Sequence, residues 1–488
     1  MAELREHDRL FIGGTWQAPA GTEVIEVVSP LTGEVVGRVP HASRDDVDRA
    51  VAAAREAFDA GPWPLLPLEE RIAVVERIGE GITARHAELA ALISEQNGCP
   101  VTWAVPGQAL VASAVVSAAV ATARQFPFEE RKQGMFGPFV QVHEPVGVVA
   151  AVVPWNVPLF AAVSKLAPAL LAGCPVVLKP SPETPLDSFV LAEIAAAAGL
   201  PKGVLSILPA DREVSEYLVA HPGVDKVSFT GSVPAGKRIM EVAAARLARV
   251  TLELGGKSAA VVLEDADLET VVQTVLSRSF VNNGQICVAL TRVLVARSRY
   301  DEIAAALVKA VSALRTGPQH DPDTQVGPLV SRRQQQRVLD YIRIGREEGA
   351  ELLSGGGVPA GLEQGCFVEP TLFGGDNTMR IAREEIFGPV VVLIPFEDED
   401  EEEAVRLAND SDYGLAGTVF SADEERALRV ARQIRSGTLG VNCARLDPLG
   451  TFGGFKESGL GRELGAEGLA AYTEIKTVHL PAEAPARA

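Results

Sequence analysis

Two short segments of the chain carry side chains that could perform covalent chemistry. Residues 252–258 read Leu-Glu-Leu-Gly-Gly-Lys-Ser, and residues 283–287 read Asn-Gly-Gln-Ile-Cys. The Glu253 carboxylate can act as a base, and the Cys287 thiol becomes a nucleophile once it loses its proton. A single cysteine is more often a small buried hydrophobic residue, so these two segments alone leave both interpretations open.

Other segments in a fixed order narrow the choice. They are Val153-Pro154-Trp155-Asn156, Leu178-Lys179-Pro180-Ser181, Phe229-Thr230-Gly231-Ser232, Glu384-Glu385-Ile386-Phe387-Gly388-Pro389 and Phe452-Gly453-Gly454-Phe455-Lys456. Together with the first two segments, they resemble the NAD(P)-dependent aldehyde dehydrogenase superfamily over residues 153–456. The resemblance implies an enzyme that oxidises an aldehyde to a carboxylic acid through a covalent thioester.

The resemblance implies a set of four catalytic residues. Asn156 and the backbone N–H of Cys287 would hold the aldehyde oxygen, because an oxyanion needs preorganised donors. Glu253 would take the thiol proton, directly or through water, and would then activate the water that hydrolyses the thioester. Glu463 matches a second family carboxylate that relays protons. Lys257 could tune the Glu253 carboxylate or be a solvated side chain.

The resemblance also implies a site for a nicotinamide dinucleotide. Lys179 and Ser181 would bind the adenosine ribose, and Ser232 would meet the pyrophosphate. Glu385 and Phe387 would hold the nicotinamide ribose and ring. The full predicted cofactor set is Pro154, Trp155, Lys179, Ser181, Gly231, Ser232, Glu385 and Phe387.

Two local patterns bear on which nucleotide is bound. Residues 231–237 nearly match a phosphate-binding loop, but Arg238 stands where that loop needs Ser or Thr to hold magnesium. We expect instead a strand-to-helix turn whose helix N-terminus faces a phosphate. Many NAD-preferring members of the superfamily carry a glutamate three residues after the lysine, where this chain has Pro182 and places Glu183 one residue later. NAD is the expected cofactor, and NADP stays an open alternative.

The substrate is expected to be a small-molecule aldehyde in an apolar, roomy pocket. Such a pocket suits medium aliphatic, terpenoid or aromatic aldehydes. Arg445 could instead recruit a carboxylated semialdehyde, or it could face solvent. The predicted pocket residues are Val157, Phe160, Ala161, Ser164, Ile286, Val288, Arg445 and Phe452.

Composition excludes several function classes. The 488 residues carry a net charge of −19 and a pI near 5.0, which argues against a nucleic-acid partner. The charged start at residues 1–6 lacks a signal-peptide core, and the apolar stretch 109–123 is shorter than the roughly 20 residues of a membrane span. Five scattered cysteines predict free thiols in a reducing cytoplasm. No histidine or cysteine spacing suggests a metal site.

Regular alternation of strands and helices predicts the architecture. Residues 148–153 are a continuous apolar run, as expected of a strand buried on both faces. The α/β alternation that follows predicts a doubly wound parallel sheet. With the resemblance, it implies two doubly wound α/β domains and an oligomerisation β-arm. The expected units are a Rossmann-like cofactor domain (1–126 and 146–257), a catalytic domain (258–444, with returning loops and a helix at 445–471) and arm strands (127–145 and 472–488) that pair subunits into a homodimer or homotetramer.

Two rival functions share this fold. A CoA-acylating semialdehyde dehydrogenase would pass the acyl group to coenzyme A, but that branch usually lacks the glutamate found at Glu253. A catalytically inert binding or structural protein would not need the complete set of Asn156, Glu253 and Cys287. Both rivals stay open at the level of sequence.

Overall fold

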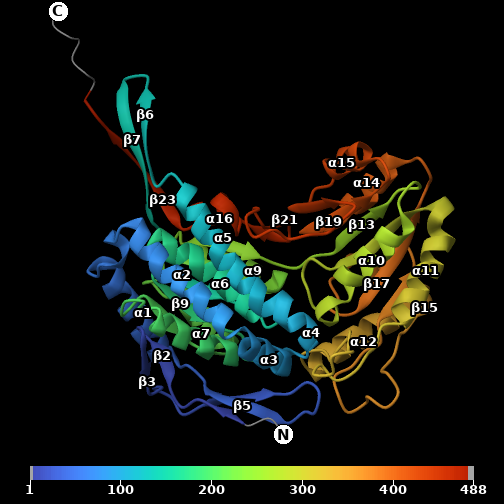
Figure 1. Ribbon diagram of the computed structural model, residues 1–488, viewed down its shortest axis with the longest axis horizontal. Coiled ribbons are helices and arrows are strands. Elements are labelled where there is room, and N and C mark those ends of the chain that lie inside the picture. The colour runs from blue at the N-terminus through green and yellow to red at the C-terminus, as the bar shows by residue number, and fades with distance from the viewer. Residues whose placement is uncertain (1–3, 482–488) are drawn as a thin grey trace, which may run out of the picture.

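The computed structural model describes residues 4–481. Its first body, where Figure 1 labels β2, β3 and β9, is built on an eight-stranded sheet with the strand order β22-β12-β11-β8-β9-β10-β2-β3. The five middle strands are parallel: β12 (Arg249–Glu253), β11 (Lys226–Thr230), β8 (Val149–Val152), β9 (Val176–Lys179) and β10 (Leu205–Ile207). Antiparallel strands close the edges: β22 (Gly459–Leu460), β2 (Leu10–Ile12) and β3 (Thr15–Gln17).

Helices cover both faces of this sheet, which confirms the doubly wound prediction. Successive side chains of β8 point to opposite faces, so Val149 and Ala151 lie in one core and Ala150 and Val152 in another. The first core includes residues of α2 (Leu68–Ala84), α3 (His86–Asn97), α5 (Val111–Gln125), α6 (Pro158–Ala172) and α7 (Leu186–Ala197). The second includes residues of α1 (Arg44–Asp59), α8 (Arg212–Ala220) and α9 (Val233–Ala244).

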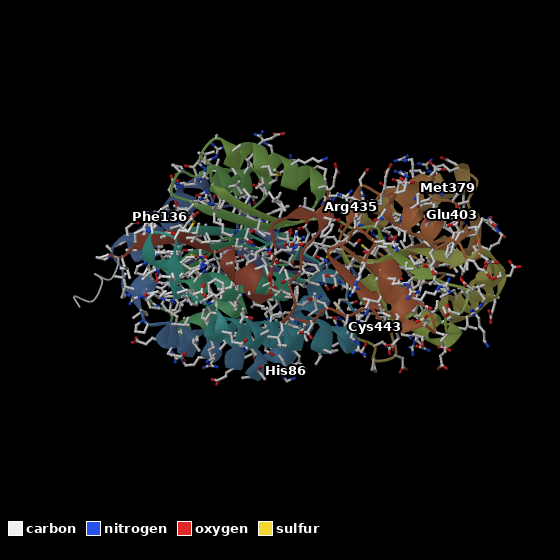
Figure 2. The ribbon with its side chains drawn as sticks, turned by 90° about the horizontal axis from the view of Figure 1, so that it is seen from above. His86, Phe136, Met379, Glu403, Arg435 and Cys443 are labelled. Atoms are coloured by element: carbon white, nitrogen blue, oxygen red, sulfur yellow. The ribbon has the colours of Figure 1, made fainter. Side chains whose placement is uncertain are left out.

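The second body repeats this plan. Its seven-stranded sheet has the order β15-β16-β17-β14-β13-β19-β20. The strands are β13 (Ser258–Val262), β14 (Leu290–Ala296), β15 (Glu351–Ser354), β16 (Thr371–Gly374), β17 (Val390–Phe396), β19 (Ala416–Phe420) and β20 (Thr438–Val441). One face packs on α10 (Leu268–Ser279) and α11 (Tyr300–Ser312), the other on α12 (Arg332–Glu347), α14 (Glu401–Asn409) and α15 (Glu424–Ala431). Figure 2 shows the two bodies side by side, with His86 on the first and Met379, Glu403 and Cys443 on the second.

A three-stranded antiparallel arm leaves the first body (Figure 1). Its order is β23 (Thr473–His479), β7 (Gly137–Pro145) and β6 (Glu129–Gly134). Met135 and Phe136 at the hairpin tip are 94% and 96% exposed. The predicted arm range 472–488 extends past the described residues, because 482–488 lie outside them. Two smaller sheets join β1 (Arg5–Glu6), β5 (Val35–Pro40) and β4 (Val24–Val28), and β18 (Tyr413–Gly414) with β21 (Phe455–Lys456).

One prediction about the apolar helix needs correction. The helical run is continuous over Val101–Gln125, through α4 (Val101–Ala104), a π-helical turn (Val105–Leu110) and α5. The run spans 25 residues, and its most apolar 18-residue window has a mean hydropathy of 1.7. By length and composition it is long and apolar enough to cross a membrane, and 44% of that window is buried in the fold. The predicted apolar stretch 109–123 is shorter than the observed helix, because the helix begins at Val101 and continues through the π turn. Its buried face packs on α2 and α6 in the first core.

Candidate active site

Cys287 follows a tight left-handed turn between α10 and β14. Asn282, Asn283 and Gly284 have φ angles of 51°, 61° and 73°, which Asn and Gly adopt more readily than other residues. The Asn283 side chain is bonded at both ends, through Nδ2 to the carbonyls of Gly98 (2.9 Å) and Pro328 (2.8 Å), and through Oδ1 to the N–H of Gly327 (2.6 Å). These bonds fasten the turn that precedes Cys287 to the segments around Gly98 and Pro328.

Two glycines bring the two chemically suggestive segments together. A Cβ added at Gly256 would lie 2.3 Å from the Cys287 carbonyl oxygen, and one added at Gly255 would lie 2.4 Å from a Glu385 carboxylate oxygen. Both distances are well inside van der Waals contact. The Gly255-Gly256 pair therefore lets the nucleophile's backbone and the Glu385 side chain approach the end of β12.

The Cys287 thiol does not ionise readily on its own. Burial raises its pKa to about 12, and the negative charges of Glu385 and Glu253 add to the rise. A thiol in this setting needs a base to become a nucleophile.

Asn156 lies between the end of β8 and the start of α6 and is buried. Its side-chain Nδ2 donates to the carbonyl of Gln285 at 2.9 Å, two residues before the nucleophile. A carboxamide has two N–H donors, so this bond orients the amide and leaves the second donor for a ligand. Asn156 and Cys287 line the same cavity, as the oxyanion hypothesis requires.

Glu253, at the end of β12, belongs to a buried group of charges. Its pKa is raised well above the ordinary value, first by burial and then by the negative charge of Glu463, while Lys165 and Arg462 lower it. The Lys165 ammonium forms a buried ion pair with Glu463 and donates to Thr230 Oγ1 at 2.6 Å. A carboxylate with a raised pKa is a stronger base near neutral pH, so the site suits general-base chemistry.

Steric constraints also explain the glycines of the Phe452-Gly453-Gly454-Phe455 segment. Gly453 has a φ of 149°, and a Cβ there would lie 2.8 Å from a Glu253 carboxylate oxygen. Phe452 next to it pairs by backbone hydrogen bonds with Glu463. The Phe-Gly-Gly-Phe segment thereby holds Glu463 beside Glu253.

A cavity of about 650 Å³ lies between the two bodies. The first body contributes residues after β8 and β11, and the second contributes residues of α12 and the segment 384–387. Six predicted cofactor residues line it, namely Pro154, Trp155, Gly231, Ser232, Glu385 and Phe387. The Trp155 and Phe387 rings meet edge to face at 5.3 Å between centroids.

The turn into α9 fits a phosphate group. Ser232 is the N-cap of this 12-residue helix, yet its side chain makes no capping hydrogen bond, so the hydroxyl is available at the helix N-terminus. Gly231 is required there because a Cβ would lie 2.4 Å from the Phe229 ring. Backbone N–H groups at a helix N-terminus favour anions.

Lys179 and Ser181 lie outside the lining of this cavity. Lys179 is buried at the end of β9, and burial lowers its pKa to about 8 against the opposing charges of Glu183 and Asp211. Ser181 donates to the Glu183 carboxylate, and Arg333 of α12 lies 3.7 Å from the same carboxylate. Many family members have a glutamate at the position of Pro182. In this chain the carboxylate comes from Glu183, the next residue, and it contacts Ser181.

The prediction that Lys257 is solvated or tunes Glu253 is wrong. Its side chain is buried, and its Nζ has no hydrogen-bond partner within residues 4–481. Burial first and then the charge of Arg292 lower its pKa to about 7, opposed by Glu385 and Glu384. Lys257 therefore acts on Glu385, which accepts a hydrogen bond from Gly256 N–H at 2.9 Å.

The predicted substrate residues are only partly assembled beside the nucleophile. Val157 lines the cavity with Cys287. Val157, Phe160 and Val288 pack against the first core, which also contains Ala161 and Phe452. The Ser164 hydroxyl donates its proton to the Phe160 carbonyl at 2.8 Å, so it could act toward a ligand only as an acceptor. Ile286 is half-buried, and Arg445 is exposed on the loop after β20.

Comparison with known proteins gives the family. A sequence profile of the aldehyde dehydrogenase family matches residues 16–478. The chain belongs to this family. A geranial dehydrogenase of Castellaniella defragrans is 46% identical over 477 residues, covering 97% of this chain and 99% of that one. A 3-succinoylsemialdehyde-pyridine dehydrogenase of a Pseudomonas species is 42% identical, with coverages of 97% and 99%.

Solved structures of aldehyde dehydrogenases have the same fold. The Mycobacterium tuberculosis aldehyde dehydrogenase complexed with NAD+ superposes with a TM-score of 0.97 at 47% identity, covering 99% of this chain and 100% of that one. A mutant aldehyde dehydrogenase C of Pseudomonas syringae, complexed with NAD+ and octanal, gives a TM-score of 0.94 at 40% identity, covering 99% and 98%. The predicted resemblance and fold class are confirmed.

Sequence reasoning missed several polar residues of this aldehyde dehydrogenase site. Lys165 is the clearest, and a signal for it existed, because it is the one charged residue in the apolar helix α6. A buried charge needs a partner, which proves to be Glu463. The other missed residues line the cavity: Arg333, Gln334, Arg337, Tyr341 and Tyr413. Within residues 4–481, no group of three or more His, Cys, Asp or Glu side chains is arranged to hold a metal ion.

Proposed function

We propose that the protein oxidises an aldehyde to the carboxylic acid, with NAD+ as hydride acceptor and Cys287 as nucleophile. The observation that carries the proposal is the meeting of Asn156, Cys287 and Glu385 in one cavity, with the buried Glu253 close enough to raise the pKa of the thiol. Each of these groups has a separate task in the reaction.

Acylation begins when Glu253 takes the Cys287 proton, directly or through water. The sulfur then bonds to the aldehyde carbon, and the Asn156 amide and the Cys287 backbone N–H hold the oxygen that becomes negative. NAD+, when bound, supplies the acceptor for the hydride that leaves this carbon, and a thioester on Cys287 is left. Water activated by Glu253 then attacks the thioester, the carbon–sulfur bond breaks, and the acid leaves. Glu463 and Lys165 pass on the proton that Glu253 collects.

The residues present fit the dinucleotide. Ser232 and the N-terminus of α9 would hold the pyrophosphate, and Glu385 and Phe387 the nicotinamide ribose and ring. Lys179 and Ser181 would hold the adenosine ribose. We favour NAD over NADP because the Glu183 carboxylate stands beside Ser181 and would repel a 2′-phosphate.

For the substrate, we propose a medium-length apolar aldehyde. Val157 lines the cavity with Cys287, and Val157, Phe160 and Val288 all pack against the first core, as Cys287 does. Apolar side chains of this kind favour an apolar substrate chain. The relationship to the geranial dehydrogenase agrees with this choice. Hydrolysis, rather than transfer to coenzyme A, is favoured by the presence of Glu253.

We also propose that two or four copies of the chain assemble through the β-arm. We assign the cofactor domain to 1–126 and 146–257, the catalytic domain to 258–444 and the pairing arm to 127–145 and 472–488. Both β23 and β20 are sheet edges with one unpaired side, and such edges are normally covered or paired. Pairing across a two-fold axis would give a homodimer or a dimer of dimers. The five free cysteines support a cytoplasmic location.

A direct assay tests the proposed function. Purified protein is incubated with octanal and NAD+, with or without coenzyme A, and reduced cofactor is followed by absorbance. We expect turnover without coenzyme A, octanoic acid as product, and none with Cys287→Ser. Turnover that depends on coenzyme A would favour the acylating rival, and no turnover with any of a panel of aldehydes would favour the inert one.

A further inference from the structure

The backbone carbonyl of Asn156 has an unusual set of partners. Three side-chain amides donate to this one oxygen: Gln108 Nε2 at 2.8 Å, Asn282 Nδ2 at 3.0 Å and Asn97 Nδ2 at 3.1 Å. All three side chains are buried, and they come from positions 48, 126 and 59 residues away in the chain. A carbonyl oxygen has two lone pairs, so three donors are more than it needs for its own satisfaction.

Two of these amides donate a hydrogen bond to the Asn156 carbonyl, but their own side-chain oxygens accept none from the described residues. Gln108 Oε1 and Asn282 Oδ1 are buried and have no hydrogen-bond partner within the described residues. An unmatched buried acceptor destabilises a fold and calls for a reason. Gln108 also sits in the π-helical turn Val105–Leu110, and single π turns inside helices are frequent at functional sites. The amides that fix the Asn156 backbone therefore lower the stability of the fold, because two of their oxygens are buried without a hydrogen bond.

Asn282 has a second contact that the other two amides lack. Its Nδ2 also donates to the carbonyl of Gln285 at 3.3 Å, the same oxygen that accepts the Asn156 side-chain N–H at 2.9 Å. One amide group therefore ties the backbone that carries Asn156 to the backbone that leads into Cys287. Those two stretches carry the two donors proposed for the aldehyde oxygen.

We infer that Asn282, supported by Gln108 and Asn97, is a positioning residue that sets the spacing between the two oxyanion donors, the Asn156 side chain and the Cys287 backbone N–H. The inference rests on the proposed function, in which those two groups hold the aldehyde oxygen. Asn282 itself touches neither substrate nor cofactor in this scheme. It acts by holding both sides of the oxyanion site at once, because oxyanion stabilisation requires donors that are fixed before the charge develops.

The neighbouring residue provides a matched control. Asn282 and Asn283 are both buried and both left-handed, so glycine can replace either without backbone strain. Asn283→Gly removes three hydrogen bonds, to Gly98, Pro328 and Gly327, but none to Asn156 or Gln285. Asn282→Gly removes the tie between the two donors.

Three measurements separate positioning from simple loss of structure. The first is the rate of the initial burst of reduced cofactor with octanal and NAD+, which requires the oxyanion site. The second is the rate at which iodoacetamide alkylates Cys287, a thiol reaction that forms no oxyanion. The third is the melting temperature. For Asn282→Gly we expect the burst to slow by about 10- to 100-fold, since a misplacement of about 1 Å can cost 100-fold, while alkylation stays near the parent rate.

The controls decide the outcome. We expect Asn283→Gly to lower the melting temperature at least as much as Asn282→Gly and to slow the burst much less. Equal slowing of the burst in both variants, or slowing of burst and alkylation in the same proportion, would overturn the inference.

Two more variants keep the test decisive. Gln108→Met removes another of the three donors to the Asn156 carbonyl, and it is used in place of Asn282→Gly if that variant fails to fold. Its control is Gln335→Met, the same change at another buried glutamine, which loses a bond to the Phe367 carbonyl (2.8 Å) in the second body. Asn156→Ala separates the two levels of the argument. If Asn156→Ala keeps the parent burst rate, the proposed oxyanion role fails. If it slows the burst and neither Asn282→Gly nor Gln108→Met does, the positioning role alone fails.

Discussion

Replacing Glu463 with glutamine removes one buried negative charge near Glu253 and keeps the shape of the side chain. In the parent protein, burial and the charge of Glu463 raise the pKa of Glu253, and Lys165 lowers it. The substitution removes the raising charge and leaves the Lys165 charge unopposed. Both changes lower the pKa of Glu253.

The size and sign of the effect follow from this geometry. A charge within a few ångströms shifts a neighbouring pKa by about 1–3 units, and one unit corresponds to about 1.4 kcal/mol. Glu253 acts as a base only when ionised, so activity is lost as pH falls through its pKa. We therefore expect the acidic limb of the kcat profile to move to lower pH by about one unit or more. The plateau rate should fall as well, because a carboxylate of lower pKa is a weaker base.

The assay is kcat for octanal oxidation with NAD+ across pH, with Glu467→Gln as the control. Glu467 lies four residues further on, is exposed, and bonds to Thr451 Oγ1 outside the buried group. Glu463→Gln should also lower stability, since an unpaired buried lysine costs about 3–5 kcal/mol, and unfolding curves measure this. An acidic limb that stays in place, moves to higher pH, or moves equally in the Glu467→Gln variant would refute the reasoning.

Three further predictions concern the cofactor, the buried lysine and assembly. Pro182→Glu should raise the ratio of kcat/KM for NAD+ over NADP+ about tenfold, or about 1.4 kcal/mol, because it adds a second carboxylate near Ser181; an unchanged ratio would mean that this loop does not reach the ribose. Lys257→Met should reduce the rise in melting temperature between about pH 7 and 10.5, because the folded protein, with a lowered Lys257 pKa, binds fewer protons there than the unfolded chain; a rise of the same size in the variant and the parent would contradict it. Ending the chain before Tyr472 removes β23 and should give a smaller, less stable species by light scattering; a full-length chain that is already monomeric would show that the arm does not pair subunits.

Local patterns in the sequence predicted most of the fold. The apolar run at 148–153 became β8, and the alternation after it became a doubly wound sheet. Local rules were less accurate at element ends. Helix α9 ends at Ala244, and Leu247, three residues later, has a positive φ of 55°. Periodicity does not show where the backbone leaves the helical region.

Candidate site residues could be named from the sequence where a short motif contains them, whereas long-range contacts could not be predicted. Asn156 and Cys287 could be identified because short segments resemble a family. The partner of Lys165 and the amide set on Asn156 could not be predicted, because these contacts are distant in the chain, 298 residues in the case of Glu463 and 126 in the case of Asn282. The burial of Lys257 was missed for the same reason, since strands and loops distant in sequence enclose it.

The covalent thioester on Cys287 is the central claim, and the Glu253→Gln variant tests it most directly. The amide cannot take a proton from water, so deacylation should stop while some acylation proceeds. The variant is mixed with octanal and NAD+, and the peptide that contains Cys287 is analysed by mass spectrometry. The account predicts an octanoyl group on Cys287 and a burst of about one reduced cofactor per subunit without further turnover. Continued turnover at the parent rate, or reduced cofactor formed with Cys287 unmodified, would contradict it.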